Sequence, residues 1–172
     1  LAETGKVAFP ILSDLSSQDC FIDGYWGDDA CIDENGVNIE AKIISKIRND
    51  SGWKGLYFGG TAFKKQRIIP KEKYGDAARY ATQFMDVVTT SGIATGIEAD
   101  ISKIKTFRSS IGDSVLAIAS GITVENAKMY SIADCFMVAT GINYENDFYE
   151  IDHKKLSNLL LVCRQIGIGE YS

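Results

Sequence analysis

The sequence contains a single histidine, His153, and no two cysteines in a C-x-x-C arrangement. Structural zinc sites are usually built from such cysteine pairs together with several histidines, so we expect no metal site. The four cysteines are widely spaced and stand mostly beside apolar residues, which favours buried, reduced thiols. Because reduced thiols are typical of proteins inside the cell, we expect a cytoplasmic protein. We expect no cofactor.

The chain also lacks a basic excess and a long apolar run. Lysine and arginine number 18 against 23 aspartates and glutamates, which gives a formal net charge of −5 at pH 7. Because nucleic acids and anionic membrane surfaces attract basic proteins, this balance argues against both partners. No apolar run approaches the ~20 residues that a membrane span needs, so we expect no membrane span. The chain begins at Leu1 rather than Met, and we expect a trimmed or partial N-terminus.

No segment rich in proline, glycine or serine divides the chain, and no sequence motif repeats at a fixed spacing. A length of 172 residues suits one domain of ordinary size. We therefore expect a single α/β domain over residues 1–172. The acidic segment GDDACIDENG (27–36) does not have the spacing of an EF-hand, and a solvated loop is favoured over a divalent-ion site there.

Short apolar segments alternate along the chain with longer segments whose apolar residues recur at helical spacing. Strands are predicted at 20–26, 55–58, 86–90, 115–119 and 135–139, with a possible further strand at 7–12. Helices are predicted at 35–49, 73–85, 100–109, 124–131 and 152–165. Strands separated by helices must pair in parallel through right-handed crossovers. The segments DVVTT and VLAIA are apolar nearly throughout, as expected when helices cover both faces of a sheet.

This pattern amounts to about five βα units, whereas a complete TIM barrel has eight. We predict an α/β fold of TIM-barrel-type parallel βα units that form a partial or truncated barrel. Three explanations stay open at this point: a fragment, a barrel whose first units are missing, and an open α/β sheet.

Two consecutive predicted strands end in a small hydroxyl residue followed by glycine, namely Ser120-Gly121 and Thr140-Gly141. TIM barrels build phosphate pockets at such strand ends. Glycine lets backbone N–H groups approach an anion closely, and a following helix N-terminus adds partial positive charge. We predict a phosphate site made of Ser120, Gly121, Ile122, Thr140 and Gly141. Simple turn chemistry is the alternative explanation for the two glycines.

Lys64 and Lys65 follow a predicted strand end, where a barrel places its functional loops. Either ammonium could pair with a substrate phosphate, although a solvated loop explains the two lysines equally well. Thr90, Ser91 and Gly92 end another strand and are predicted to line the ligand pocket.

Asp23 is the best carboxylate for general base chemistry, because we expect it at the catalytic end of the strand 20–26, beside aromatic residues that exclude water. The alternative is that Asp23-Gly24 only forms a turn. Asp134 precedes a predicted strand, at the end away from the proposed site, and we expect it to be structural.

Three motifs follow one another in the later part of the chain: SGIATG (91–96), SGITVEN (120–126) and ADCFMVATG (133–141). Their order resembles the TG-x-x-TG, SG-V-T-x-x-N and D-x-x-x-V-G elements of the BtpA family, (βα)8-barrel proteins named for a role in photosystem I biogenesis. The last two motifs are shared with many phosphate-binding barrels. The resemblance extends over residues 21–163, and it implies a barrel fold with an anion pocket.

This sequence differs from the BtpA family at the positions where the family's motifs carry polar residues. The family's D-x-K-x-K-H pattern corresponds to FGGTAFKKQ (58–66), which keeps a lysine pair but has glycine for the acid and Gln66 for the histidine. The family's Arg-x-Glu-like pattern corresponds to DGYW (23–26). The resemblance therefore implies a fold and a binding pocket more than an activity.

Two functions follow from these observations. The first is an enzyme, or a degenerate enzyme, that acts on a phosphorylated sugar or nucleotide-like molecule. The second is a non-catalytic binding or assembly protein of the BtpA type. An open parallel sheet exposes two edges, so we also expect a homo-oligomer or a partner chain that covers them.

Overall fold

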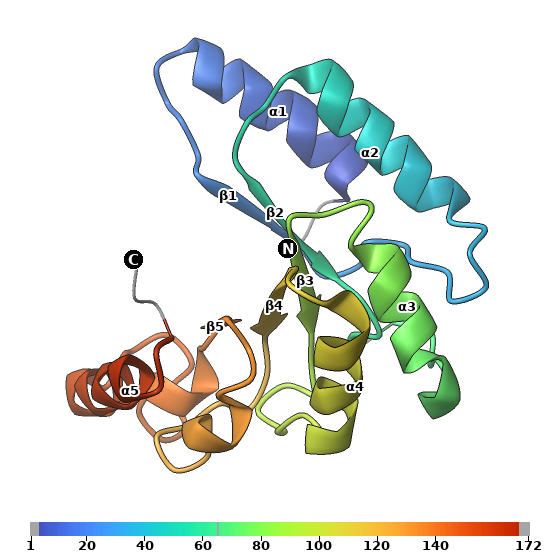
Figure 1. Ribbon diagram of the computed structural model, residues 1–172. Coiled ribbons are helices and arrows are strands. Elements are labelled where there is room, and N and C mark those ends of the chain that lie inside the picture. Colours follow the sequence, from blue (N-terminus) through green and yellow to red (C-terminus); the bar gives the residue numbers. More distant parts are fainter. Residues whose placement is uncertain (1–3, 65, 169–172) are drawn as a thin grey trace.

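The structure is a computed structural model that describes residues 4–64 and 66–168. Its sheet has five parallel strands in the order β1-β2-β3-β4-β5, so each strand pairs with the next strand of the sequence. The strands are β1 (Gly24–Gly27), β2 (Leu56–Gly60), β3 (Val87–Thr90), β4 (Val115–Ile118) and β5 (Cys135–Phe136). The sheet curls into a half-barrel (Figure 1), which confirms the α/β prediction of TIM-barrel-type units in a partial barrel.

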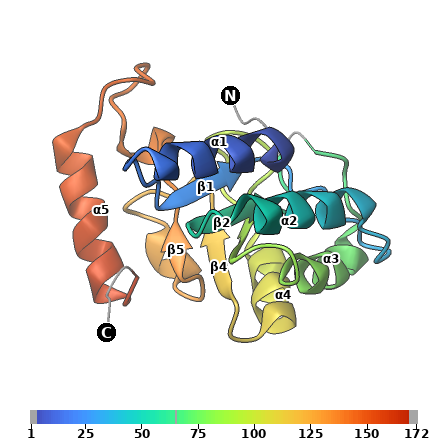
Figure 2. The ribbon, with the colours of Figure 1, turned by 90° about the horizontal axis from the view of Figure 1, so that it is seen from above.

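Helices alternate with these strands. The α-helices are α1 (Gly5–Ser17), α2 (Ile39–Ser51), α3 (Tyr74–Ala81), α4 (Ile101–Ile111) and α5 (His153–Gln165). Three short 3₁₀ segments are η1 (Lys71–Lys73), η2 (Ala127–Tyr130) and η3 (Thr140–Ile142). Helices α1 and α2 lie side by side over β1 and β2, and α3 packs against α4 (Figures 1 and 2).

The possible strand at 7–12 is wrong, because this segment lies inside α1. Ala8, Phe9 and Leu12 are buried and recur at helical spacing, so they form one stripe that faces the sheet. The Phe9 ring lies edge-on to the Tyr25 and Tyr57 rings, at centroid distances of 5.4 and 5.2 Å. These contacts fix α1 against β1 and β2.

Two Arg–Asp pairs stabilise the amino end of the sheet. Asp86 precedes β3, accepts a 2.7 Å hydrogen bond from the Tyr57 backbone N–H of β2, and pairs with Arg48 of α2. Asp134 precedes β5, accepts a 2.7 Å hydrogen bond from the Leu116 N–H of β4, and pairs with Arg108 of α4 at 2.8 Å. Each carboxylate thus ties a helix to a strand, and the structural role predicted for Asp134 is confirmed.

Asp100 is the N-cap of α4, since its carboxylate accepts a 2.8 Å hydrogen bond from the Ser102 N–H at the start of that helix. The helix predicted at 124–131 is wrong: after β4 the chain makes a turn followed only by the four-residue segment η2. Asn126 explains this difference, because its side chain accepts a hydrogen bond from the Thr123 N–H and donates one to the Gly121 carbonyl. An asparagine that bonds to nearby backbone groups competes with helix formation.

Candidate functional site

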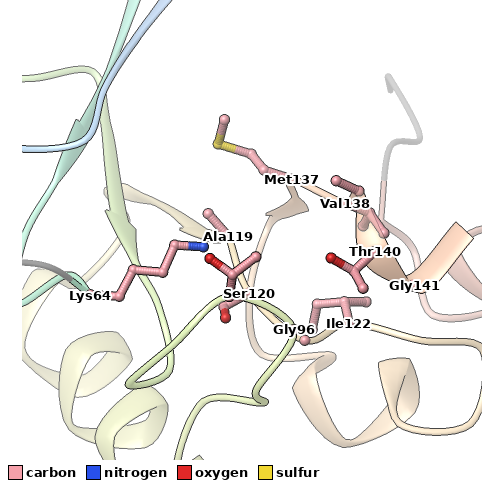
Figure 3. A pocket seen from close by; sticks show the side chains of 12 residues that line it. Lys64, Gly96, Ala119, Ser120, Ile122, Met137, Val138, Thr140 and Gly141 are labelled. Atoms are coloured by element: carbon pink, nitrogen blue, oxygen red, sulfur yellow. The ribbon is translucent and has the colours of Figure 1, made fainter. Parts of the chain in front are cut away.

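A small cavity of about 60 Å³ lies at the carboxyl ends of β4 and β5 (Figure 3). Six of the predicted phosphate-binding residues line it: Lys64, Ser120, Gly121, Ile122, Thr140 and Gly141. They come from the loops that follow β2, β4 and β5, so the curl of the sheet brings together segments that are far apart in the sequence. Lys65, the other predicted lysine, lies outside the described residues.

The two glycines of the site allow one loop to pack directly on another. A Cβ atom at Gly121 would lie 2.3 Å from the backbone nitrogen of Glu98, and Gly121 itself has a φ of +64°. A Cβ atom at Gly141 would lie 1.9 Å from the carbonyl oxygen of Ile122. Since neither distance is possible for a real Cβ atom, both positions require glycine for the loops to meet. This requirement holds with or without a bound anion.

The hydroxyl groups of the site differ in their surroundings. Ser120 Oγ lies 2.9 Å from the Ala94 carbonyl oxygen and 2.7 Å from that of Ile97, so its proton holds the loop between β3 and α4. The Thr140 hydroxyl points across the cavity toward Ser120 (Figure 3), and it makes no hydrogen bond within the described part of the chain. Of the two hydroxyls, that of Thr140 is the better placed to bind a ligand.

Three residues that line the cavity have backbone N–H groups without protein partners. Those of Gly121, Ile122 and Gly141 donate no hydrogen bond to any residue that the structure describes. The Lys64 side chain extends its ammonium toward Ala119 and Ser120 (Figure 3), and no carboxylate stands among the described residues that line the cavity. One cation and several N–H donors make a favourable setting for a small oxyanion.

The predicted contribution of helix N-termini to this setting is wrong. No α-helix begins at either loop: η2 starts only at Ala127, and η3 has three residues. The Thr123 N–H, at the expected helix start, already donates to the Asn126 side chain at 2.8 Å. Positive potential in the cavity therefore comes from local N–H groups and Lys64, because so short a segment has no appreciable macrodipole.

The three residues predicted for the ligand pocket separate into two groups. Thr90 is fully buried, its hydroxyl lies 3.5 Å from the Ala62 carbonyl oxygen, and it does not line the cavity at β4 and β5, so its place in a ligand pocket stays a prediction. Ser91 and Gly92 line a second, larger cavity of about 460 Å³ at the carboxyl end of β3. The Ser91 hydroxyl accepts a 2.8 Å hydrogen bond from the Lys64 backbone N–H, which fixes the loop that carries Lys64.

Lys103, in the first turn of α4, is a candidate that the sequence analysis missed. Its side chain is 8% exposed, and its Nζ donates hydrogen bonds to the carbonyl oxygens of Ala62 at 2.5 Å and Ser91 at 2.8 Å. Burial lowers the pKa of the Lys103 ammonium to about 8, against a smaller opposing effect of Asp100. The sequence does indicate that Lys103 lies on the buried face of α4, since it stands at helical spacing with the apolar Phe107 and Ile111.

The expected position of Asp23 is wrong. Strand β1 begins at Gly24 rather than at residue 20, so Asp23 precedes the strand instead of ending it. Its carbonyl oxygen accepts a 2.7 Å hydrogen bond from the Leu56 N–H at the start of β2, and its side chain is exposed. Because all five strands are parallel, Asp23 lies at the amino end of the sheet, away from the cavity.

The carboxylates that follow the carboxyl end of β1 are Asp28 and Asp29. Asp28 accepts a 2.8 Å hydrogen bond from the Trp26 indole N–H, and Asp29 accepts one from the Cys31 backbone N–H. Gln66 donates to the Asp28 carbonyl at 2.7 Å, so it ties this acidic loop to the loop after β2. Within the described residues, no group of three or more His, Cys, Asp or Glu side chains is placed to hold a metal ion.

No protein-family model matches the chain, and no curated protein matches it at a significant level. The resemblance to the BtpA family is not tested by these comparisons and stays a prediction. None of the helices in residues 4–64 and 66–168 is both long and apolar enough to cross a membrane.

Proposed function

We propose that this protein binds a phosphorylated small molecule, with the phosphate in the cavity between β4 and β5. The observation that carries the proposal is the set of donors around that cavity: the unpartnered N–H groups of Gly121, Ile122 and Gly141, beside the Lys64 ammonium. A hydrogen bond to a charged group contributes about 1.5–3 kcal/mol, so a few of them suffice for specific binding.

The size of the cavity supports an oxyanion rather than a larger group. A volume of about 60 Å³ is room for only a few water molecules. The organic part of the ligand would then lie outside it. A neighbouring cavity of about 220 Å³ is lined by Phe63, Gln66 and Arg67, and Lys64 lines both cavities. A sugar-sized group bound there would place its phosphate beside Lys64.

Two candidate functions remain, an enzyme and a non-catalytic binding protein. The small cavity favours binding, because Lys64 is the only titratable side chain among the described residues that line it. The resemblance to the BtpA family points to the same anion pocket and to no defined reaction. We therefore propose binding of a phosphorylated ligand as the primary function, with catalysis as the alternative.

The open edges of the half-barrel support a second proposal, on assembly. Within the described residues β1 and β5 each pair on one side only. Leu56 of β2 and Val115 of β4 are also apolar side chains exposed on the sheet. We propose that a second copy or another chain covers these edges, since unpaired strand edges promote association.

The phosphate site can be tested by calorimetry with inorganic phosphate and with a sugar phosphate. Lys64→Met and Thr140→Val should each weaken binding by about tenfold, a loss of ~1.4 kcal/mol per variant. Lys105→Met removes an exposed lysine of α4 that lines neither this cavity nor the neighbouring one beside Phe63, and it should leave the affinity unchanged. Equal affinities in the wild type and both site variants, with unchanged thermal stability, would refute the proposed site.

A further inference from the structure

Lys103 is a buried amine between two loops at the carboxyl end of the sheet. Its two hydrogen-bond acceptors are the Ala62 carbonyl after β2 and the Ser91 carbonyl after β3. The rings of Tyr74 and Phe107 lie nearby, with centroids 5.2 and 5.8 Å from Nζ. The amine is therefore held in one position, surrounded by carbonyl dipoles and aromatic faces.

Cavities lie on both sides of this amine. Lys103 lines the cavity of about 460 Å³ together with Ser91 and Tyr130, and it also lines the cavity of about 220 Å³ beside Phe63. Tyr74 borders both cavities as well. The larger volume falls in the range of small-molecule sites, so it has room for a ligand of a few carbon atoms beside Lys103.

The charge state of Lys103 makes it a better nucleophile than an exposed lysine. With its pKa at about 8, about one molecule in ten carries the neutral amine at pH 7, whereas an ordinary lysine is neutral in about one molecule in 2,500. Asp100, at the N-cap of its own helix, opposes this shift of the pKa. The other charged residues that line the two cavities with Lys103 are Lys71, Glu98, Lys64 and Arg67. Desolvated lysines of this kind form Schiff bases with carbonyl substrates.

We propose that Lys103 forms an imine with the aldehyde or ketone carbon of a small ligand bound in these cavities. The neutral amine attacks the carbonyl carbon, a C–N bond forms, and a proton passes from the nitrogen to the carbonyl oxygen to give a carbinolamine. The hydroxyl of the carbinolamine then takes up one proton from the solvent and leaves as water, which gives a protonated imine. One water is released for each imine formed, and no oxidant or reductant takes part.

The surroundings of Nζ favour this product over other products of an amine. A protonated imine keeps its positive charge and one N–H, which can still donate to the Ala62 or the Ser91 carbonyl. The aromatic faces of Tyr74 and Phe107 stabilise the same charge. A carbamate formed with carbon dioxide would instead place a negative charge against two carbonyl oxygens. A carbonyl compound is therefore the ligand class that fits, whether or not the phosphate site is confirmed.

The test uses the whole wild-type chain with glyceraldehyde and sodium cyanoborohydride, which reduces an imine to a stable secondary amine. Peptide mapping by mass spectrometry then gives the labelling rate at each lysine. Lys105 is the internal control, because it lies on the same helix and is exposed. At pH 7 Lys103 should be labelled at least tenfold faster than Lys105. Labelling of Lys103 at the same rate as Lys105, or more slowly, would overturn the proposal.

A pH profile separates a reactive amine from a merely structural cation. The labelling rate at Lys103 should reach half of its maximum near pH 8, following the pKa of the ammonium, and level off above it. A rate that keeps rising through pH 10 would overturn the proposal. Lys103→Arg, checked for its fold by circular dichroism, keeps a cation beside the two carbonyls, and the fast-labelled site should then be absent. Fast labelling that persists elsewhere in this variant would assign the reactivity to another residue.

Discussion

Replacing Lys103 with methionine tests the buried ammonium through the pH dependence of stability. Methionine keeps an unbranched apolar chain beside Tyr74 and Phe107 but removes the titrating group. In the folded protein the ammonium has a pKa of about 8, whereas in the unfolded chain it should have the ordinary value near 10.4. Between these two pH values the unfolded chain binds more protons, so the free energy of unfolding of the wild type rises with pH.

The size of this effect follows from the difference between the two pKa values. The stabilisation is fully present above the unfolded pKa and is lost as the pH falls through the folded pKa, near 8. From pH 7 to pH 10 the wild type should gain roughly 2–3 kcal/mol relative to Lys103→Met. The absolute difference at pH 7 also contains the two lost hydrogen bonds, so the change with pH is the quantity to measure.

Urea unfolding followed by circular dichroism, at pH 7, 8, 9 and 10, gives this change. Other titrating groups affect the wild type and the variant alike, so they cancel in the difference. Lys105→Met is the matched control, since its lysine is exposed on the same helix, and its difference from the wild type should not vary with pH. A difference between the wild type and Lys103→Met that stays constant within about 0.5 kcal/mol would refute the buried, weakly basic ammonium.

Three further outcomes are expected. Gly121→Ala should prevent native packing of the loop on Glu98, whereas Gly52→Ala, in the left-handed region with open space around it, should cost only about 1–2 kcal/mol in thermal unfolding; equal costs would contradict this packing. Asp134→Asn should lower the free energy of unfolding by about 1–2 kcal/mol through the loss of its Arg108 pair; an unchanged value would refute that role. Light scattering should show an oligomer, and a stable monomer would contradict coverage of the open edges.

The alternation of strands and helices, and with it the parallel fold, could be predicted from the sequence because it depends on local patterns. The segments around β3 and β4 are apolar nearly throughout, and Asp100 marks the start of α4. Where local signals conflict, prediction failed. The apolar residues of α1 also suit a short strand, and Asn126 prevents a helix that the spacing of its neighbours favours.

The alternation of strands and helices and the two glycine-containing loops follow from the sequence, since each depends on residues close together along the chain. What those loops do depends on tertiary contacts. The need for glycine at Gly121 arises from its contact with Glu98, and the lowered pKa of Lys103 arises from its burial between Ala62 and Ser91. Both effects depend on contacts between segments distant in sequence, and such contacts exist only once the sheet has curled.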